Sequence, residues 1–250
     1  MSLQSTDGYD PSGNARKVVE GVYTLSQRKG GRIHAFLLDD AGAFTLVDTL
    51  YDSDGALIVR AFQQMGRNIT DLKNIILTHA HRSHIGGLAA LKKLSGAKVW
   101  AHESESDIIA GKRKSPGTTF IPQWPLKVYP IQFALNIGVD GHAPCEVDAF
   151  LKEGDSVGPL QIIHAAGHSP GHLAMYWKQR SALFAGDALA TWPELSLGWP
   201  GLTLDQDQNL QSLRKIDDLR ADVIAVGHGE PATGEQIEHL RRLIRSGQVH

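Results

Sequence analysis

The chain has 250 residues, of which 42% are hydrophobic and 21% are charged, and its formal net charge is -2. This composition fits a globular protein with a sizeable core, and it excludes a general attraction to nucleic acid or to anionic membranes. The single cysteine, Cys145, excludes an internal disulfide, and no apolar run approaches the roughly 20 residues of a transmembrane helix. We therefore expect one globular domain over residues 1–250, with no nucleic-acid or membrane partner.

The start of the chain, residues 1–16, is polar, and we expect it to be disordered or extended. It lacks the apolar middle of a secretory signal, which favours a cytoplasmic location. Three short apolar or β-branched runs follow, at 22–25, 34–38 and 44–47. Because glycine-containing turns separate them, they predict a small antiparallel meander.

After this meander, the spacing of the apolar residues changes from that of strands to that of a helix. Apolar residues at helical spacing over 57–65 predict a helix, capped by a residue among 52–54 and stopped by Gly66. Strands are then expected at 74–77 and 97–100, with a helix between them that Gly86-Gly87 opens. Together these pieces predict a βαβ unit.

The middle of the chain, residues 111–145, gives no regular pattern because five prolines interrupt it. Its aromatic residues favour a lid or binding loop over a free linker. The alternative is a surface excursion that packs its aromatic rings for stability.

The second half of the chain has a similar succession of predicted strands and helices. Strands are expected at 156–157, 160–164, 172–177, 182–185 and 223–226, and helices at 204–219 and 234–245. Two similar halves of strands and helices predict an α/β protein with two sheets face to face and helices outside.

Three histidines lie within six residues, at His79, His81 and His84, directly after the apolar run 75–77. Neutral imidazole is a common ligand of transition metals, and a loop at the end of a buried strand can aim several rings at one point. Three other predicted strands end in a glycine followed by one polar residue, which is His168, Asp187 or His228. Together with the histidine cluster, these strand ends predict a metal site.

These motifs resemble those of the metallo-β-lactamase superfamily, in the same order along residues 20–245: His79-Ala80-His81-Arg82-Ser83-His84, Gly167-His168-Ser169-Pro170-Gly171-His172, Gly186-Asp187 and Gly227-His228. The resemblance implies a four-layer αβ/βα sandwich with the site at one edge, between the sheets. It also implies that His79, His81 and His168 hold a first metal, that Asp187 bridges two ions, and that His84 and His228 serve the second. Zn²⁺ is the expected ion, with Mn²⁺ or Fe²⁺ as alternatives.

The chain departs from this family at Ser83, where the family usually has an aspartate that binds the second metal. Because a neutral hydroxyl is a much poorer donor than a carboxylate, we expect a tightly held first ion and a weak or empty second site. In the alternative interpretation Ser83 only supports the loop, and water or a carboxylate from Glu103, Asp205 or Asp207 completes the second site.

Such a site favours hydrolysis, because a bound metal ion activates water and polarises a carbonyl group. Asp187 could orient the water as well as bind metal, and His228 could donate to a developing oxyanion when it is not coordinated. We expect His172 and Asp48 to support the ligands from behind rather than to bind metal.

The apolar residues after Asp187, above all Trp192 and Trp199, predict a wall for a small, partly apolar substrate. The alternative is that these rings pack onto the sandwich or form a contact in a homodimer. An ester, lactone, thioester or amide is the expected substrate class; a glutathione thioesterase is disfavoured because little chain follows His228. Two alternatives belong to other classes of protein. One is a mononuclear iron dioxygenase, and the other is a metal-binding protein that lost its activity together with the family's aspartate at position 83.

Overall fold

The computed structural model describes residues 14–139 and 141–247. Of the start that we expected to be disordered or extended, residues 1–13 lie outside this range, and Arg16 already begins a strand. None of the helices in the described residues is long and apolar enough to cross a membrane.

The strands of the first half are β1 (Arg16–Val19), β2 (Val22–Gln27), β3 (Ile33–Asp40), β4 (Ala43–Val47), β5 (Leu72–Ile76), β6 (Lys98–Ala101) and β7 (Ala149–Phe150). Those of the second half are β8 (Ser156–Val157), β9 (Leu160–His164), β10 (Leu173–Trp177), β11 (Ala182–Ala190), β12 (Val223–His228) and β13 (Ala232–Thr233).

The helices are α1 (Lys29–Arg32), α2 (Ala56–Gln64), α3 (Arg82–Ile85), α4 (Leu88–Ser95), α5 (Ser106–Ile109), α6 (Tyr129–Asn136), α7 (Gln206–Asp217) and α8 (Glu235–Ser246). Short 3-10 turns occupy Ile69–Asp71, Glu103–Glu105, Leu126–Val128 and Lys178–Arg180.

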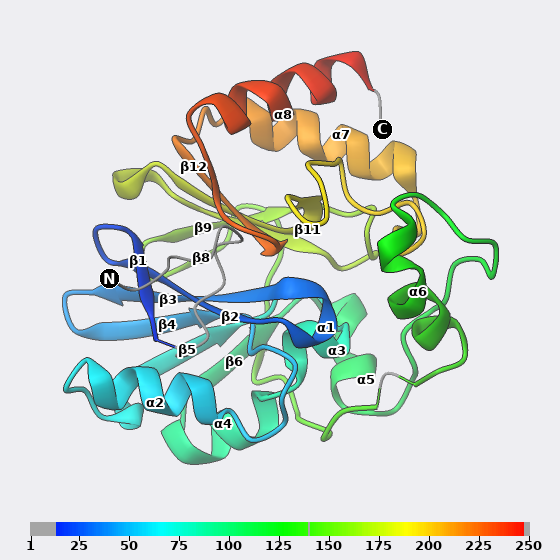
Figure 1. Ribbon diagram of the computed structural model, residues 1–250. Helices are drawn as coiled ribbons and strands as arrows, with labels where there is room; N and C mark the ends of the chain where they lie inside the picture. The colour runs from blue at the N-terminus through cyan, green and yellow to red at the C-terminus, as the bar shows by residue number, and fades with distance from the viewer. Residues whose placement is uncertain (1–13, 140, 248–250) are drawn as a thin grey trace, which may run out of the picture.

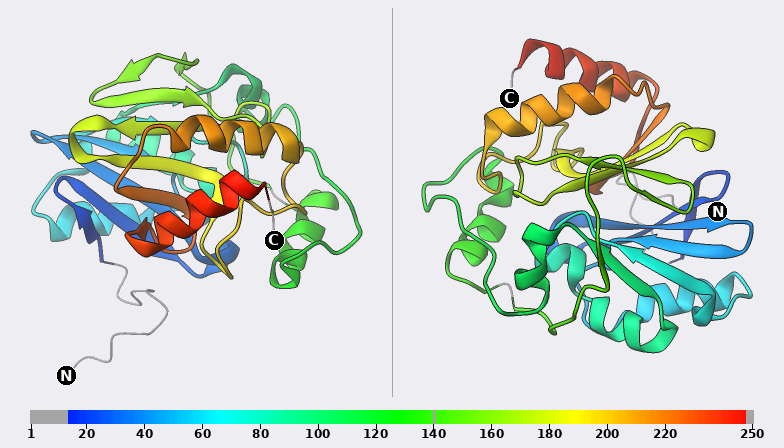
Figure 2. Two further views of the ribbon diagram at one scale, coloured as in Figure 1. Left: turned by 90° about the horizontal axis from the view of Figure 1, so that it is seen from above. Right: turned by 180° about the vertical axis from the view of Figure 1, so that it is seen from behind.

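One curled sheet carries both halves, in the order β7-β6-β5-β4-β3-β12-β11-β10-β9-β8. Its two halves face each other, with α2 and α4 outside one half and α7 and α8 outside the other (Figure 1). The view from behind shows the same four layers (Figure 2). The predicted αβ/βα sandwich is therefore confirmed. The halves meet where β3 pairs with β12, at Ile33 and His228.

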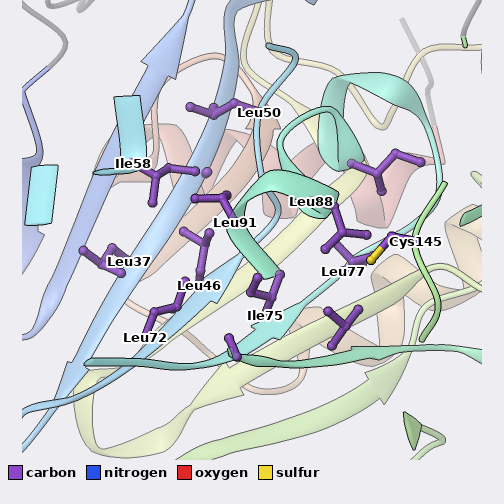
Figure 3. Close-up of a cluster of buried hydrophobic side chains, with 14 of the residues drawn as sticks. Leu37, Leu46, Leu50, Ile58, Leu72, Ile75, Leu77, Leu88, Leu91 and Cys145 are labelled. Carbon is purple, nitrogen blue, oxygen red and sulfur yellow. The ribbon is translucent and has the colours of Figure 1, made fainter. Parts of the chain in front are cut away.

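Strand β3 shows why the sequence folds in this way. Successive side chains of a strand point to opposite faces, and here both faces are buried. Leu37 belongs to the core between the sheet and α2 and α4 (Figure 3), whereas Phe36 belongs to the core between the two halves of the sheet. A third cluster lies between the second half of the sheet and α7 and α8.

The predicted meander is confirmed, because β2, β3 and β4 pair antiparallel. The βαβ unit is also confirmed, since β5 and β6 are parallel neighbours with α4 between them in the chain. Helix α2 ends at Gln64 with Met65 as its C-cap, and Gly66 follows with a φ of 67°, as expected of a residue that stops a helix.

Two expectations were wrong. Residues 111–145 are not without regular structure, because α6 forms there with Pro130 in its first turn. Proline is tolerated at that position, where its missing N–H has no partner within the helix. Strand β11 does not stop at Ala185 but continues to Ala190, with shifts of register against β12 around Gly186.

Candidate metal centre

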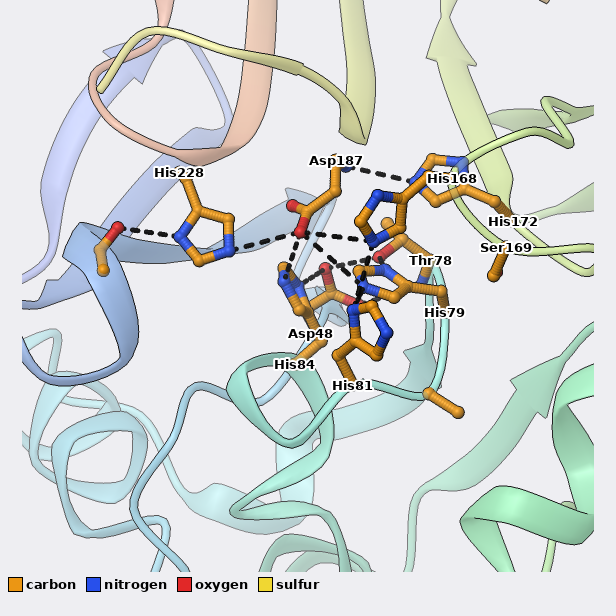
Figure 4. A network of polar contacts seen from close by, with 12 residues as sticks. Asp48, Thr78, His79, His81, His84, His168, Ser169, His172, Asp187 and His228 are labelled. Atoms are coloured by element: carbon orange, nitrogen blue, oxygen red, sulfur yellow. Dashed lines mark hydrogen bonds and ion pairs between the residues drawn. The ribbon is translucent and has the colours of Figure 1, made fainter. Parts of the chain in front are cut away.

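The predicted ligand residues converge at one edge of the sandwich, between the two halves of the sheet (Figure 4). His79 and His81 lie in the loop after β5, and His84 lies in α3. His168 comes from the turn between β9 and β10, Asp187 from the irregular part of β11, and His228 from the end of β12. Because a bulge re-aims a side chain, the register shift at Gly186 explains how a strand residue faces the centre.

Two groups of potential ligand atoms are present, each with its atoms within 4.8 Å of one another. We define group 1 as His79, His81, His168 and Asp187, and group 2 as His84, Asp187 and His228. Asp187 is common to both. Its Oδ2 lies 3.3 Å from His84 Nε2 and 3.2 Å from His228 Nε2.

The nitrogens of group 1 are spaced like the ligands of one ion. His81 Nδ1 lies 3.0 Å from His79 Nε2 and 3.1 Å from His168 Nε2, while Asp187 Oδ2 lies 3.7 Å from each of those Nε2 atoms. Ligand atoms around a tetrahedral ion with bonds of about 2.0–2.1 Å would be about 3.3 Å apart. Burial, with the neighbouring imidazoles, keeps the pKa of both His79 and His168 well below its usual value, so these rings are neutral, as ligands must be.

A chain of hydrogen bonds sets the tautomer of His79. The Thr78 hydroxyl donates to Asp48 Oδ2 at 2.8 Å, which uses its only proton. The contact of 3.0 Å between Thr78 Oγ1 and His79 Nδ1 therefore needs the proton on the ring. This leaves the lone pair of His79 on Nε2, the atom that faces the centre.

Asp48 holds His84 in the same manner. Its Oδ2 lies 2.8 Å from His84 Nδ1, and its Oδ1 accepts the backbone N–H of Thr78 at 2.8 Å. Although burial opposes a charged ring, Asp187 and Asp48 raise the pKa of His84 to about 10. Two buried carboxylates therefore favour positive charge between them. Asp48 itself has a φ of 61°, a costly conformation for a residue other than glycine, of the kind that concentrates at functional sites.

His228 has its tautomer fixed by the backbone. Its Nδ1 donates to the carbonyl oxygen of Gly31 at 2.7 Å, because a carbonyl can only accept. The neutral ring then has a lone pair and no proton at Nε2. In this tautomer Nε2 could bind a metal ion; donation to an oxyanion, expected only of an uncoordinated His228, stays a prediction.

Asp187 is buried, and its side chain needs the space that a glycine leaves. A side-chain carbon at Gly227 would lie 1.9 Å from Asp187 Oδ1. Burial alone would raise the pKa of Asp187, but His228 and His84 hold it well below its usual value. The carboxylate is therefore anionic and able to face cations.

His172 lies behind Asp187. Its Nε2 accepts the backbone N–H of Asp187 at 3.1 Å, so this nitrogen faces the strand and not the two groups. Burial lowers the pKa of His172 to about 4, which keeps the ring neutral and able to accept.

Ser83 lines the cavity beside the centre and belongs to neither group. The three carboxylates suggested as its substitutes are also outside both groups. Glu103 is exposed in a 3-10 turn, Asp205 accepts the N–H of Gln208 at the start of α7, and Asp207 is exposed in that helix. Among the described residues, Asp187 is thus the one carboxylate of group 2.

Glu105 was missed by the sequence interpretation. It is 2% exposed, and its carboxylate joins the two loops that carry group 1. Oε2 accepts the backbone N–H of Ala80 at 3.0 Å, and Oε1 accepts Ser169 Oγ at 2.7 Å and the N–H of Gly171 at 2.9 Å. Nothing in the local sequence marks this glutamate, because its partners are distant in the chain.

A cavity of about 230 Å³ opens on Asp187 and His228. Helix α6 forms its apolar side, through residues that include Ile131 and Leu135. Trp192 and Trp199, the predicted wall, are not among its lining residues. Trp199 is buried, and the centre of its ring lies 4.3 Å from the centre of the His228 ring, so it packs against this histidine from behind.

The centre fits a metal ion on the evidence of its own atoms. His84 Nε2 and Asp187 Oδ1 are buried and have no hydrogen-bond partner in the described residues. Buried polar atoms are usually satisfied, and two such atoms in one nitrogen-rich cluster are typical of a site for a cation.

The fold and this centre define a metal-binding protein of the αβ/βα sandwich class. The model of the metallo-beta-lactamase superfamily matches residues 28–228, and the chain belongs to this superfamily.

Among curated proteins, the probable metallo-hydrolase YflN of Bacillus subtilis (strain 168) is 27% identical over 242 residues, 90% of this chain and 89% of that protein. The hydroxyacylglutathione hydrolase of Jannaschia sp. (strain CCS1) is 30% identical over 162 residues, 62% of this chain and 47% of that protein. Among solved structures, the metallo-beta-lactamase family protein TTHA1429 from Thermus thermophilus has a TM-score of 0.66 at 24% identity, covering 93% of this chain and 81% of that one.

Proposed function

We propose that this protein is a hydrolase that uses a divalent metal ion to cleave an ester, lactone, thioester or amide bond of a small, partly apolar substrate. Membership of the superfamily and the likeness to a probable metallo-hydrolase support metal-dependent hydrolysis. The observation that carries the proposal is the cavity beside the His/Asp centre, because it brings an apolar wall to Asp187 and His228.

Group 1 would hold a first ion through His79, His81, His168 and Asp187. Three imidazoles and one carboxylate suit Zn²⁺, and Mn²⁺ or Fe²⁺ are alternatives. Group 2 would hold a second ion through His84, His228 and a share of Asp187. Since one carboxylate would face two dications, we propose that the second ion binds weakly.

A bound divalent ion would supply Lewis acidity and a water of lowered pKa. The residues of the chain would orient this water and position the substrate. Asp187 Oδ1 accepts no hydrogen bond from the described residues, and this carboxylate could orient the attacking water through one of its protons. The apolar side chains of α6 limit the access of bulk water and place the acyl part of the substrate.

The test is a substrate panel assayed with the protein loaded in turn with Zn²⁺, Mn²⁺ and Fe²⁺. The panel contains lactones, simple thioesters, an acylglutathione and a cephalosporin reporter. The acylglutathione is included because one relative is named a hydroxyacylglutathione hydrolase. We expect turnover of at least one acyl class and its loss on chelation. Absence of turnover with every ion would contradict the proposal and favour a metal-binding protein without activity.

A further inference from the structure

The cavity beside the centre has two chemically different sides. Pro130, Ile131, Ala134 and Leu135 of α6 give one side an apolar surface. Lys29, Tyr51 and Arg82 belong to its other lining residues. A purely apolar substrate would form no favourable contact with two cations. This second side of the cavity therefore favours a ligand that also has a polar or anionic group.

Of the two cations, Arg82 gives the stronger evidence for a bound ligand group. Its guanidinium carbon lies 4.6 Å from the centre of the Tyr51 ring, a distance typical of a cation–π contact, and Nη1 donates to the carbonyl of Gly141. Its Nε is buried without a hydrogen-bond partner, and no carboxylate of residues 14–139 or 141–247 forms an ion pair with it. A buried guanidinium donor without an acceptor is costly, and a ligand oxygen would relieve that cost.

Lys29 lies on the same aromatic ring, with Nζ 4.8 Å from the centre of Tyr51. It also pairs with Asp52 at 3.0 Å, but the two side chains are 62% and 44% exposed, so this pair holds the ammonium only weakly. An ammonium has three donors, and only one is needed for Asp52. Among the described residues, Arg82 and Lys29 are thus two cations beside the single carboxylate of Asp52.

Backbone geometry keeps the three side chains together. Gly30, next to Lys29, has a φ of 78°, and a side-chain carbon there would lie 2.7 Å from the Tyr51 ring. Only glycine allows this close approach. The ring of Tyr51 therefore holds Lys29 from one segment and Arg82 from another beside the same cavity.

We propose that Arg82 and Lys29 bind an anionic group of the substrate, a carboxylate at the end distant from the bond that is cleaved. This proposal rests on the proposed hydrolase function. The substrate class is a small acyl compound with an apolar middle, which lies on α6, and a free carboxylate, which Arg82 binds by charge-assisted hydrogen bonds. The volume of about 230 Å³ lies below the range of about 300–1,000 Å³ for drug-sized ligands, which favours a short acyl chain.

Equilibrium binding tests this without any turnover. The zinc-loaded protein is titrated calorimetrically with adipate and with its monoamide, which has the same length and one carboxylate instead of two. The first carboxylate of either ligand can reach the centre, so the difference between them reports the distal group. We expect adipate to bind about tenfold more tightly, as one charge-assisted contact implies.

The Arg82→Met variant should lose this difference, and Arg82→Lys should keep part of it. Lys93→Met, which removes one exposed lysine of α4, is the matched control and should keep it all. Zinc content is measured for each variant, so that a lost centre is not mistaken for a lost contact.

Equal affinities for the two ligands, a difference that survives in Arg82→Met, or no binding of either would overturn the proposal. If inorganic phosphate displaced adipate with equal affinity, the Arg82 and Lys29 side of the cavity would be a site for free anions. This result would also overturn the proposal. Failure of the hydrolase function has a different signature, since the substrate panel would then show no turnover whatever the adipate titrations give.

Discussion

Groups 1 and 2 of the centre share Asp187 but are built in different ways. In group 1, the His79–His81 loop and the His168 loop come from opposite halves of the sheet, and Glu105 joins them. In group 2, each histidine is oriented singly, His84 by Asp48 and His228 by the carbonyl of Gly31. Group 1 therefore depends on how two loops are held together, whereas group 2 depends on individual side chains and lacks a carboxylate of its own at Ser83.

The largest effect is expected where the two groups overlap. Asp187→Asn keeps the shape and removes the charge, so both groups should lose metal at once. Loss of this shared ligand should exceed the roughly 10–100-fold loss of affinity that follows removal of an outer hydrogen-bond partner. Competition with a chromogenic chelator measures it, and the exposed Asp218→Asn is the control. An Asp187→Asn protein that still binds metal like the parent would show that this carboxylate is not a ligand.

The next largest effect is expected from a substitution that weakens metal binding in group 1 but not in group 2. Glu105→Gln replaces one carboxylate oxygen with an amide nitrogen, which cannot accept the N–H of Ala80 while the other oxygen serves Ser169 and Gly171. We expect affinity for the first ion to fall by about 10–100-fold and the free energy of unfolding by about 1–3 kcal/mol.

Glu103→Gln is the matched control for Glu105→Gln, because Glu103 lies two residues away and is exposed. Chelator competition gives the affinity, and chemical denaturation gives the stability. A loss of stability with unchanged metal affinity would mean that Glu105 supports the fold and does not position the ligands.

A smaller effect, larger at group 2 than at group 1, is expected from Asp48→Asn. Asp48 contacts His84 directly but reaches His79 only through the Thr78 hydroxyl. The second ion should therefore bind about tenfold more weakly, and the first ion should lose less affinity. Titration of protein already loaded with one ion per chain measures the second step. Equal weakening of both ions would contradict the separation of the two groups.

Much of this fold could be predicted because its signals are local. The alternation of apolar residues in β3 and the helical spacing in α2 are readable from short windows of sequence. Helix α6 was missed because Pro130 was taken to prevent a helix, although proline in the first turn does not. The extension of β11 past Gly186 was missed because a bulge continues a strand where glycine looks like its end.

The candidate site was predictable where its residues follow a strand end, as His79 and His228 do. Glu105 and the cavity were not, because they depend on contacts between distant segments. Ala80 and Gly171 meet at Glu105 only after the sheet has curled, and Ile131 reaches the cavity only through the packing of α6. Trp199 was expected in the cavity from its closeness to Asp187 in sequence, but it packs behind His228.

The smallest expected effect is a gain. Ser83→Asp should restore an anionic oxygen beside group 2 and raise the affinity for the second ion by about tenfold, since carboxylates are far better donors than hydroxyls. Ser83→Asn, of the same shape without the charge, is the control. A gain in Ser83→Asn equal to that in Ser83→Asp would show that size rather than charge limits the second site.

The most direct test of the difference between the groups is the metal content of the unmodified protein after zinc loading and extensive dialysis, measured by elemental analysis. A tight group 1 and a weak group 2 predict one zinc ion per chain. Two ions per chain that survive dialysis would contradict this account and show that the second site is complete without a carboxylate at Ser83.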